Sequence, residues 1–226
     1  MSGKVVLYYF DGRGKMESIR WLLAVAGVEF EEVFLTTRAQ YEKLVNDGAL
    51  LFHQVPMVEM DGMKLVQSKA IRNYIAGKYN LYGKELKERG EVLGLHGPPN
   101  GGFSDAHSKR VMRKKRKTDT QTTKEIHKHE NFPPLYYIHL TPFQWIMFLV
   151  GNQLSCADVN FFEACLMLEE ELPTILSSFP NIQAFQKRME AIPTINKFLQ
   201  PGRQRKPVPD EVHVKIVREV LSHIYI

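Results

Sequence analysis

The chain has 226 residues, of which 44% are hydrophobic, so it is long enough for one large domain or two small ones with a sizeable core. Its two cysteines are too few for a disulfide scaffold and indicate a reducing compartment. The N-terminus lacks an apolar stretch followed by small residues, and no run approaches the roughly 18 apolar residues of a membrane span. We therefore expect neither a signal peptide nor a membrane span.

The formal net charge is +5, from 30 Lys+Arg against 25 Asp+Glu, and most of it lies in one segment. Residues 90–130 hold nine basic and five acidic side chains, which puts them at +4 and the rest of the chain at +1. Seven of the nine residues in 109–117 are basic, and such a run could bind nucleic acid. No aromatic residues interleave with it, so we expect a solvated tract and keep nucleic-acid binding as the alternative.

The first 80 residues alternate between strand and helix patterns in the order β-α-β-α-β-β-α. Strands are expected over 4–10, 28–35, 55–60 and 63–66, and helices over 16–26, 38–46 and from Ser68, which can cap its helix. The βαβ opening favours parallel pairing, and an Asp61-Gly62 turn predicts an antiparallel hairpin. This is the arrangement of a thioredoxin-like domain, without the Cys-x-x-Cys that disulfide exchange needs.

The remainder of the chain is helical only towards its end. Residues 80–89 look like a polar linker, and neither helical nor strand spacing is found in 90–131. Helical spacing returns after Gly151, where Ser155 and Asp158 stand at capping-box spacing, and a final amphipathic helix follows Asp210.

These patterns define the expected domains and fold class. We predict an α/β thioredoxin-like domain over residues 1–82 and an all-α domain over 83–226. Within the second domain, residues 90–147 diverge, with disorder as one interpretation.

Seven motifs, taken together and in order, resemble those of the cytosolic glutathione transferases of the alpha class. They are LYYFDGRG (7–14), MESIRWLL (16–23), QVPMV (54–58), DGMKLVQS (61–68), YNLYGK (79–84), LVGNQLS (149–155) and KFLQPG (197–202). The resemblance implies a dimeric cytoplasmic enzyme that conjugates glutathione to apolar electrophiles, such as xenobiotics and lipid-peroxidation products. It implies glutathione as a co-substrate, no cofactor and no metal.

The resemblance also assigns the catalytic residues. Tyr9 matches the tyrosine whose hydroxyl stabilises the glutathione thiolate, and Lys15 stands where the class usually has an arginine. Attack on an electrophile requires the thiolate, and a hydrogen bond to sulfur lowers the thiol pKa from about 8.5. Without the resemblance, Tyr9 would be interpreted as a core aromatic residue.

Besides Tyr9, Lys15 and position 45, the expected glutathione-binding residues come from two parts of the chain. Gln54, Val55 and Pro56 match the segment that pairs with the peptide-like ligand, and the Val55–Pro56 bond is expected to be cis. Gln67 and Ser68 match the residues that hold the γ-glutamyl carboxylate, at a helix N-terminus that favours an anion.

Further residues match the substrate pocket and the dimer interface. Phe10, Val214, Val217 and Leu221 are candidates for electrophile contacts, with ordinary packing as the alternative. Phe52 matches the aromatic key that enters the partner subunit, and its alternative is a core phenylalanine.

Three departures bear on activity. Lys15 keeps a positive charge but lacks the planar fork of arginine. Val45 replaces a basic residue that contacts the glycyl carboxylate. Residues 90–147 stand in place of two long helices in unchanged register, as a change of reading frame or of splicing would give, with Gly101 and Asn131 at the positions of two charged residues. The alternative function is therefore a non-catalytic protein of the same fold that binds glutathione or apolar ligands.

Overall fold

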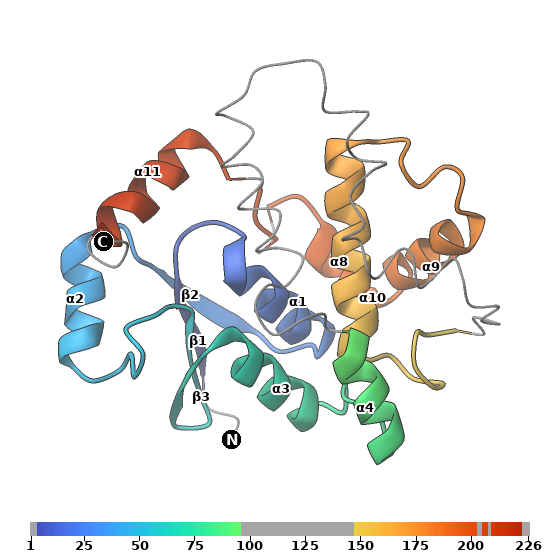
Figure 1. Ribbon diagram of the computed structural model, residues 1–226, viewed down its shortest axis with the longest axis horizontal. Helices are drawn as coiled ribbons and strands as arrows, with labels where there is room; N and C mark the ends of the chain where they lie inside the picture. Colours follow the sequence, from blue (N-terminus) through green and yellow to red (C-terminus); the bar gives the residue numbers. More distant parts are fainter. Residues whose placement is uncertain (1–3, 96–146, 203–204, 208, 223–226) are drawn as a thin grey trace. The chain divides into compact units, whose positions relative to one another are not determined.

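The computed structural model describes residues 4–95, 147–202, 205–207 and 209–222 (Figure 1). The chain forms two compact units, Met1–Leu81 with Lys187–Ile226, and Tyr82–Gln186. The first unit therefore contains both ends of the chain. The domain limits expected from the sequence stay a prediction, and the basic run, Gly101 and Asn131 lie outside the described residues.

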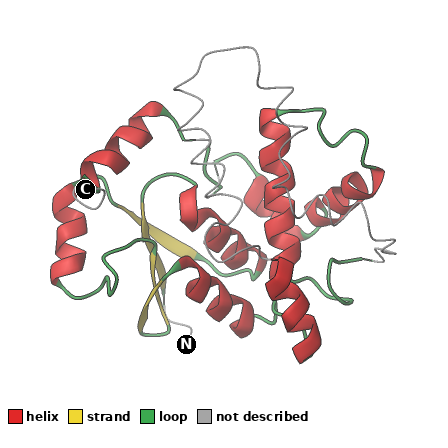
Figure 2. Ribbon diagram, in the orientation of Figure 1, coloured by secondary structure: helices red, strands yellow, loops and turns green. Residues whose placement is uncertain are grey.

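A four-stranded mixed sheet forms the centre of the first unit (Figure 2). Its strands are β1 (Val5–Tyr9), β2 (Phe30–Phe34), β3 (Met57–Met60) and β4 (Met63–Val66), in the order β2-β1-β3-β4. Strand β1 runs parallel to β2, with Tyr9 opposite Phe34, and antiparallel to β3. Strands β3 and β4 form the expected hairpin. The thioredoxin-like topology is confirmed.

Helix α1 (Glu17–Val25) is almost entirely buried in the first unit. A short 3-10 turn, η1 (Gly14–Met16), leads into it, and nearly all of its side chains are buried. It packs against α3 (Ser68–Lys78) and α10 (Pro193–Leu199). The Trp21 ring meets the Phe198 ring edge-on at 4.8 Å between centroids, so α10 is anchored to the first domain although it lies far away in sequence.

Helices α2 (Arg38–Asn46) and α11 (Glu211–Val220) lie beside each other in the first unit (Figure 1). Thr37 and Gln40 form a capping box at the start of α2, and the Asp210 carboxylate accepts a hydrogen bond from the His213 N–H (2.8 Å) at the start of α11. Val220 joins a buried cluster with Phe10, Leu35, Tyr41, Ala49, Leu50 and Met57. The C-terminal helix thus belongs to the core around the end of β1.

The second unit contains α4 (Leu86–Leu95), α8 (Cys156–Glu171) and the first residues of α9 (Pro180–Glu190). The expected capping box opens α8. The Asp158 carboxylate accepts hydrogen bonds from the Ser155 N–H (2.9 Å) and the Leu149 N–H (2.7 Å). Burial nevertheless raises the pKa of Asp158, because desolvation outweighs these hydrogen bonds. Cys156 and Cys165 are buried free thiols.

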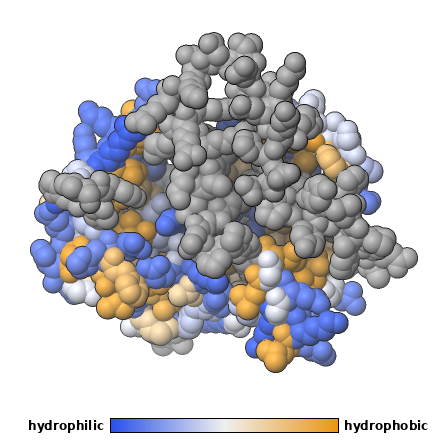
Figure 3. Space-filling view, viewed as in Figure 1, coloured by the Kyte–Doolittle hydropathy of each residue, from blue (hydrophilic) through white to orange (hydrophobic). Residues whose placement is uncertain are grey.

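Helix α4 was not expected from the sequence. Residues 80–89 were expected to be a linker and the chain from 90 onward to be aperiodic, but Leu86–Leu95 is helical. Val92 is buried and α4 packs against α8, whereas Leu86, Leu93 and Leu95 are exposed. Figure 3 shows hydrophilic and hydrophobic side chains mixed over α4. The helix has a narrow buried stripe and two glycines, so its apolar spacing gives little signal.

No helix within the described ranges is long and apolar enough to cross a membrane. The same residues contain no group of three or more His, Cys, Asp or Glu side chains that could hold a metal ion.

Candidate functional site

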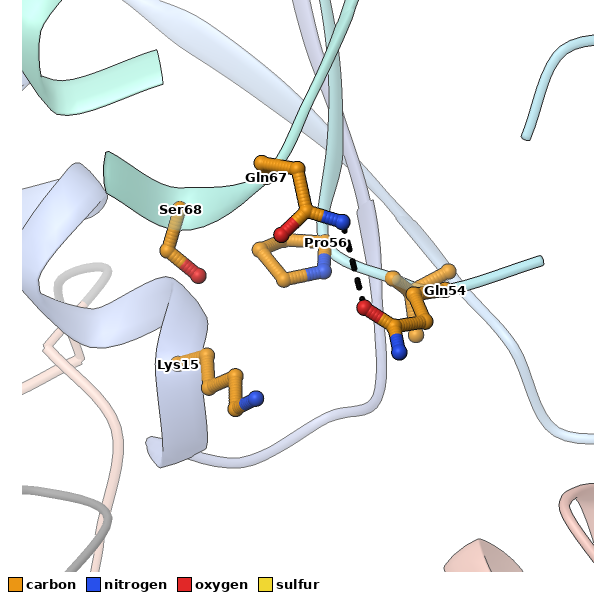
Figure 4. A pocket seen from close by; sticks show the side chains of 6 residues that line it. Lys15, Gln54, Pro56, Gln67 and Ser68 are labelled. Atoms are coloured by element: carbon orange, nitrogen blue, oxygen red, sulfur yellow. Dashed lines mark hydrogen bonds between the residues drawn. The ribbon is translucent and has the colours of Figure 1, made fainter. Parts of the chain in front are cut away.

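Six residues from three separate segments of the chain line one open cleft in the first unit (Figure 4). Its volume is about 190 Å³, including solvent at its mouth, and it is lined by Lys15, Gln54, Val55, Pro56, Gln67 and Ser68. All six are residues that the sequence predicts to bind glutathione. The structure therefore gathers segments that are up to 53 residues apart, counted from Lys15 to Ser68.

The segment before β3 supplies one wall of the cleft. The Val55–Pro56 bond is cis, which confirms that expectation. Pro56 is buried, whereas the Gln54 side chain is exposed. The Gln67 amide Nε2 donates a hydrogen bond to Gln54 Oε1 (3.1 Å, dashed in Figure 4). The two glutamines thus connect the Val55–Pro56 turn to the start of α3.

The start of α3 has an unusual backbone. Gln67 occupies the N-cap position with φ 70° and ψ 111°, a conformation that disfavours non-glycine residues by about 1–3 kcal/mol. Its side chain makes no capping hydrogen bond, and Ser68 is the first helical residue rather than the cap that we expected. Backbone N–H groups at this end are therefore left for an anion beside Ser68.

Tyr9 ends β1 and lies next to the cleft without lining it. The backbone N–H of Lys15 donates a hydrogen bond to Tyr9 Oη (3.1 Å). Gly14 has φ +42°, and a Cβ there would lie 2.5 Å from Tyr9 Oη, so only glycine fits between the ring and the loop. Tyr9 Oη thus accepts a hydrogen bond from the backbone of the loop that follows β1.

The electrostatics of the cleft depend on Lys15. It is the one basic side chain lining the cleft in the part of the chain that the structure describes. Val45 lies on α2 and packs against the Phe10 cluster instead of reaching the cleft. The departure at position 45 therefore replaces a charge with apolar packing.

The expected electrophile residues are partly brought together. Phe10 is only 3% exposed, and Val217 and Leu221 pack against its cluster. Val214 is half-buried and does not join this cluster. Helix α11 thus covers Phe10 with two of the three predicted side chains.

His213 belongs to the same helix face and was missed by the sequence interpretation. Its ring meets the Phe10 ring edge-on at 6.4 Å between centroids, and a Cβ on Gly12 would collide with it. The signal was the spacing of His213, Val217 and Val220, which places them on one side of a helix. A search restricted to apolar residues overlooks it.

Phe52 is 56% exposed, next to the even more exposed Leu51. The alternative of a core phenylalanine is therefore wrong. A large exposed aromatic residue with an apolar neighbour is a feature of interaction surfaces.

The fold and cleft define a thioredoxin-like protein with an open polar cleft near the end of β1. Comparison with known proteins identifies the family. The N-terminal domain of glutathione S-transferases matches residues 5–77, and the C-terminal domain matches residues 104–202. The second match includes residues 104–147, which we expected to fall outside the resemblance.

Curated relatives match over nearly the whole chain. "Glutathione S-transferase 3" from Gallus gallus is 54% identical over 100% of this chain and 98% of its own length. "Glutathione S-transferase A4" from Mus musculus is 51% identical over 98% of this chain and 100% of its own length. "Glutathione S-transferase alpha-4" from Rattus norvegicus is 50% identical, again over 98% and 100%.

A solved glutathione S-transferase from Caenorhabditis elegans has a TM-score of 0.69 at 26% identity, covering 92% of this chain and 100% of its own. The chain belongs to the glutathione S-transferase family, in its alpha class, and is a transferase that uses glutathione.

Proposed function

We propose that this transferase joins the glutathione thiolate to apolar electrophiles, with Tyr9 donating its hydroxyl proton to the sulfur. Xenobiotics and lipid-peroxidation products are the substrate classes. The observation that carries the proposal is the combination of one cleft lined by six predicted residues with the Lys15 N–H that orients Tyr9 Oη. Nothing in the comparisons favours the non-catalytic alternative.

Thiolate stabilisation is the main chemical task of the site. A free thiol with a pKa of about 8.5 is mostly protonated at neutral pH, and each unit of lowered pKa corresponds to about 1.4 kcal/mol. The Tyr9 hydroxyl stabilises the anion by a hydrogen bond, and the Lys15 ammonium adds a positive field. The thiolate then forms a C–S bond, and the electrophile either releases its leaving group or takes up a proton.

The polar parts of glutathione are proposed to bind at the two ends of the cleft. The γ-glutamyl carboxylate lies at the start of α3, near Gln67 and Ser68, where N–H groups and the helix dipole favour an anion. Gln54 and Val55 pair with the peptide-like backbone. Val45 offers no charge to the glycyl carboxylate, which weakens binding by about 1.5–3 kcal/mol relative to a basic residue.

The apolar electrophile is proposed to bind beneath α11, near Phe10, Val217 and Leu221. Because Phe10 is nearly fully buried there, the helix must shift for a bulky substrate to enter. Val214 stays a candidate at the edge of this region.

Assembly and location complete the proposal. The exposure of Phe52 supports a homodimer in which this side chain enters the partner subunit. The cytoplasm, where glutathione is abundant and the two buried thiols stay reduced, is the proposed location.

The test is conjugation of a reactive aryl halide by the wild-type protein and by Tyr9→Phe. We expect the variant to lose roughly 10–100-fold in kcat, with glutathione affinity retained, because one charge-assisted hydrogen bond is lost. An inactive wild-type protein that still binds glutathione would instead support the non-catalytic alternative.

The basic run at 109–117 supplies the second alternative and needs its own test. Affinity for DNA and RNA is measured at two salt concentrations. Phosphate contacts would make it fall steeply with salt, whereas we expect no measurable binding.

A further inference from the structure

A cluster of buried charges beside Tyr9 has no role in the thiolate chemistry. Arg20 is fully buried, and its Nε donates to Glu32 Oε1 (2.6 Å). Its Nη1 donates to Glu17 Oε2 (3.0 Å) and to the Gly12 carbonyl oxygen (2.8 Å). Arg20 therefore fixes the loop that follows Tyr9.

Lys206 enters the same cluster from the other end of the chain. Its Nζ lies 2.9 Å from Glu32 Oε2 and 3.0 Å from Asp11 Oδ1. The ammonium also lies 4.3 Å from the centre of the Phe34 ring, and the side chain is only 14% exposed. Glu32 thus binds Arg20 with one carboxylate oxygen and Lys206 with the other.

The backbone of Lys206 is held as well. Its carbonyl oxygen accepts a hydrogen bond from Arg13 Nε (2.6 Å). Lys206 is therefore fixed at its side chain and its main chain by residues of the loop 10–16 and by β2. A solvated surface ion pair would have neither this burial nor this number of partners.

The chain runs from Lys206 directly into α11. Asp210 caps the helix four residues later, and His213 rests on Gly12 and Phe10. The helix itself is held to the first domain mainly by apolar packing of Ile216, Val217 and Val220. Fixing Lys206 therefore fixes the end from which α11 extends.

We propose that Lys206 is a positioning residue that holds α11 over Phe10 and so determines how tightly the enzyme binds the apolar part of its substrate and product. This proposal rests on the proposed function. Through its contacts with Asp11 and Glu32, Lys206 couples the loop after Tyr9 to α11, the helix that covers Phe10. The polar cleft lined by Gln54, Gln67 and Ser68 is not held by Lys206, so glutathione itself should bind equally well without it.

The experiment uses the whole chain of 226 residues and four variants. Lys206→Met keeps the length of the side chain but removes the charge, and Lys206→Arg restores the charge. The control is Lys215→Met within α11, because the Lys215 side chain is 77% exposed and its Nζ lies 3.8 Å from Glu219 Oε1, as in a solvated pair. Calorimetry measures the Kd of glutathione and of S-methyl-, S-butyl- and S-hexylglutathione, and hydrogen exchange measures the amides of 211–220.

We expect Lys206→Met to leave the Kd of glutathione within about twofold and to weaken S-hexylglutathione about tenfold, with a smaller effect for the shorter chains. Exchange in α11 should accelerate about tenfold. Lys206→Arg should restore most of the affinity for S-hexylglutathione and most of the slow exchange in α11. Lys215→Met should change neither the affinity nor the exchange. Asp11→Asn removes the charge of the more exposed partner of Lys206 and should produce smaller changes of affinity and exchange in the same direction. It replaces Lys206→Met in the test if that variant fails to fold.

Three results would overturn the proposal: no change of α11 exchange in Lys206→Met, an equal loss for glutathione and S-hexylglutathione, or the same effects in Lys215→Met. Failure of the proposed function gives a different result. In that case the wild-type protein binds no glutathione, while hydrogen exchange still shows whether Lys206 holds α11.

Discussion

The polar cleft and the apolar region beneath α11 are built in opposite ways. The cleft is open and polar, and its shape comes from loop backbone at the Val55–Pro56 bond and at Gln67. The apolar region is closed and consists of side chains from β1, α2 and α11. Short segments of the chain suffice to shape the polar cleft. The apolar region forms only when α11, near the end of the chain, packs against residues at the end of β1.

This difference predicts that the two regions respond differently to substitution. The cleft depends on a main-chain conformation such as the positive φ of Gln67, which few side chains adopt without strain. A region formed by side chains on a helix can change with each substitution on that helix. The predictions below separate the two regions.

The largest effect is expected for Arg20→Met, which should damage both regions. It leaves Glu17 and Glu32 buried without their main cation, and loss of one partner of a buried ion pair costs about 3–5 kcal/mol. Denaturant unfolding should show this loss of stability, and both glutathione and S-hexylglutathione should bind more weakly. A variant as stable as the wild type would mean that the buried pair contributes little.

A smaller and more local effect is expected for Gly14→Ala. The methyl group meets Tyr9 Oη, and the positive φ of residue 14 adds about 1–2 kcal/mol of strain. We expect kcat with an aryl halide to fall roughly tenfold, because the Tyr9 hydroxyl is displaced. The matched control is Gly77→Ala in α3, where a Cβ meets nothing within 4 Å. Equal effects in both variants would contradict a role for Gly14 in placing Tyr9.

Val45→Arg tests the glycyl end of the polar cleft, from a position whose present side chain packs against the Phe10 cluster. The arginine should lower the Kd of glutathione by about tenfold, since it offers the glycyl carboxylate a charge-assisted hydrogen bond. The gain should be the same for S-hexylglutathione, because both ligands carry the glycyl carboxylate. A change confined to S-hexylglutathione would mean that the arginine acts through the apolar region and not on the glycyl carboxylate.

The smallest effect concerns Cys165 in the second unit, which supplies none of the described residues of either region. Burial raises the pKa of this thiol to about 12. Between about pH 9 and 12 the unfolded chain releases this proton and the folded chain keeps it, so stability falls by about 1.4 kcal/mol per pH unit. Cys165→Ala should remove that part of the slope, as measured by urea unfolding at pH 8 and pH 10. An unchanged slope would mean that the folded thiol ionises readily.

The residues of the polar cleft are predicted by the resemblance, and local features accompany several of them. A proline before a strand, an Asp-Gly turn and a serine at a helix start are all visible within a few residues. Even so, the left-handed backbone of Gln67 was not predicted, because no glycine or asparagine stands there to indicate it.

The rest could not be predicted, because its determinants lie far apart in the chain. Lys206 and Glu32 look like ordinary surface charges until folding brings them within 2.9 Å. Val92 is buried, and α4 packs against α8. This packing outweighs the two glycines, which weaken a helix and suggested an irregular segment. His213 is polar, so its place on the apolar face of α11 is apparent only from its contact with Phe10.

The shared carboxylate of Glu32 has a consequence for cutting and recombining this chain. An excised thioredoxin-like segment that ends at Leu81 would lack Lys206. Its cluster would then hold three carboxylates (Asp11, Glu17 and Glu32) and only two cations (Arg13 and Arg20). Such a fragment should be less soluble and less cooperative in unfolding than the whole chain. A chimera that exchanges α11 between relatives should therefore be joined after Lys206. The recipient then keeps its own Lys206 together with Glu32 and Asp11, the two carboxylates that pair with it.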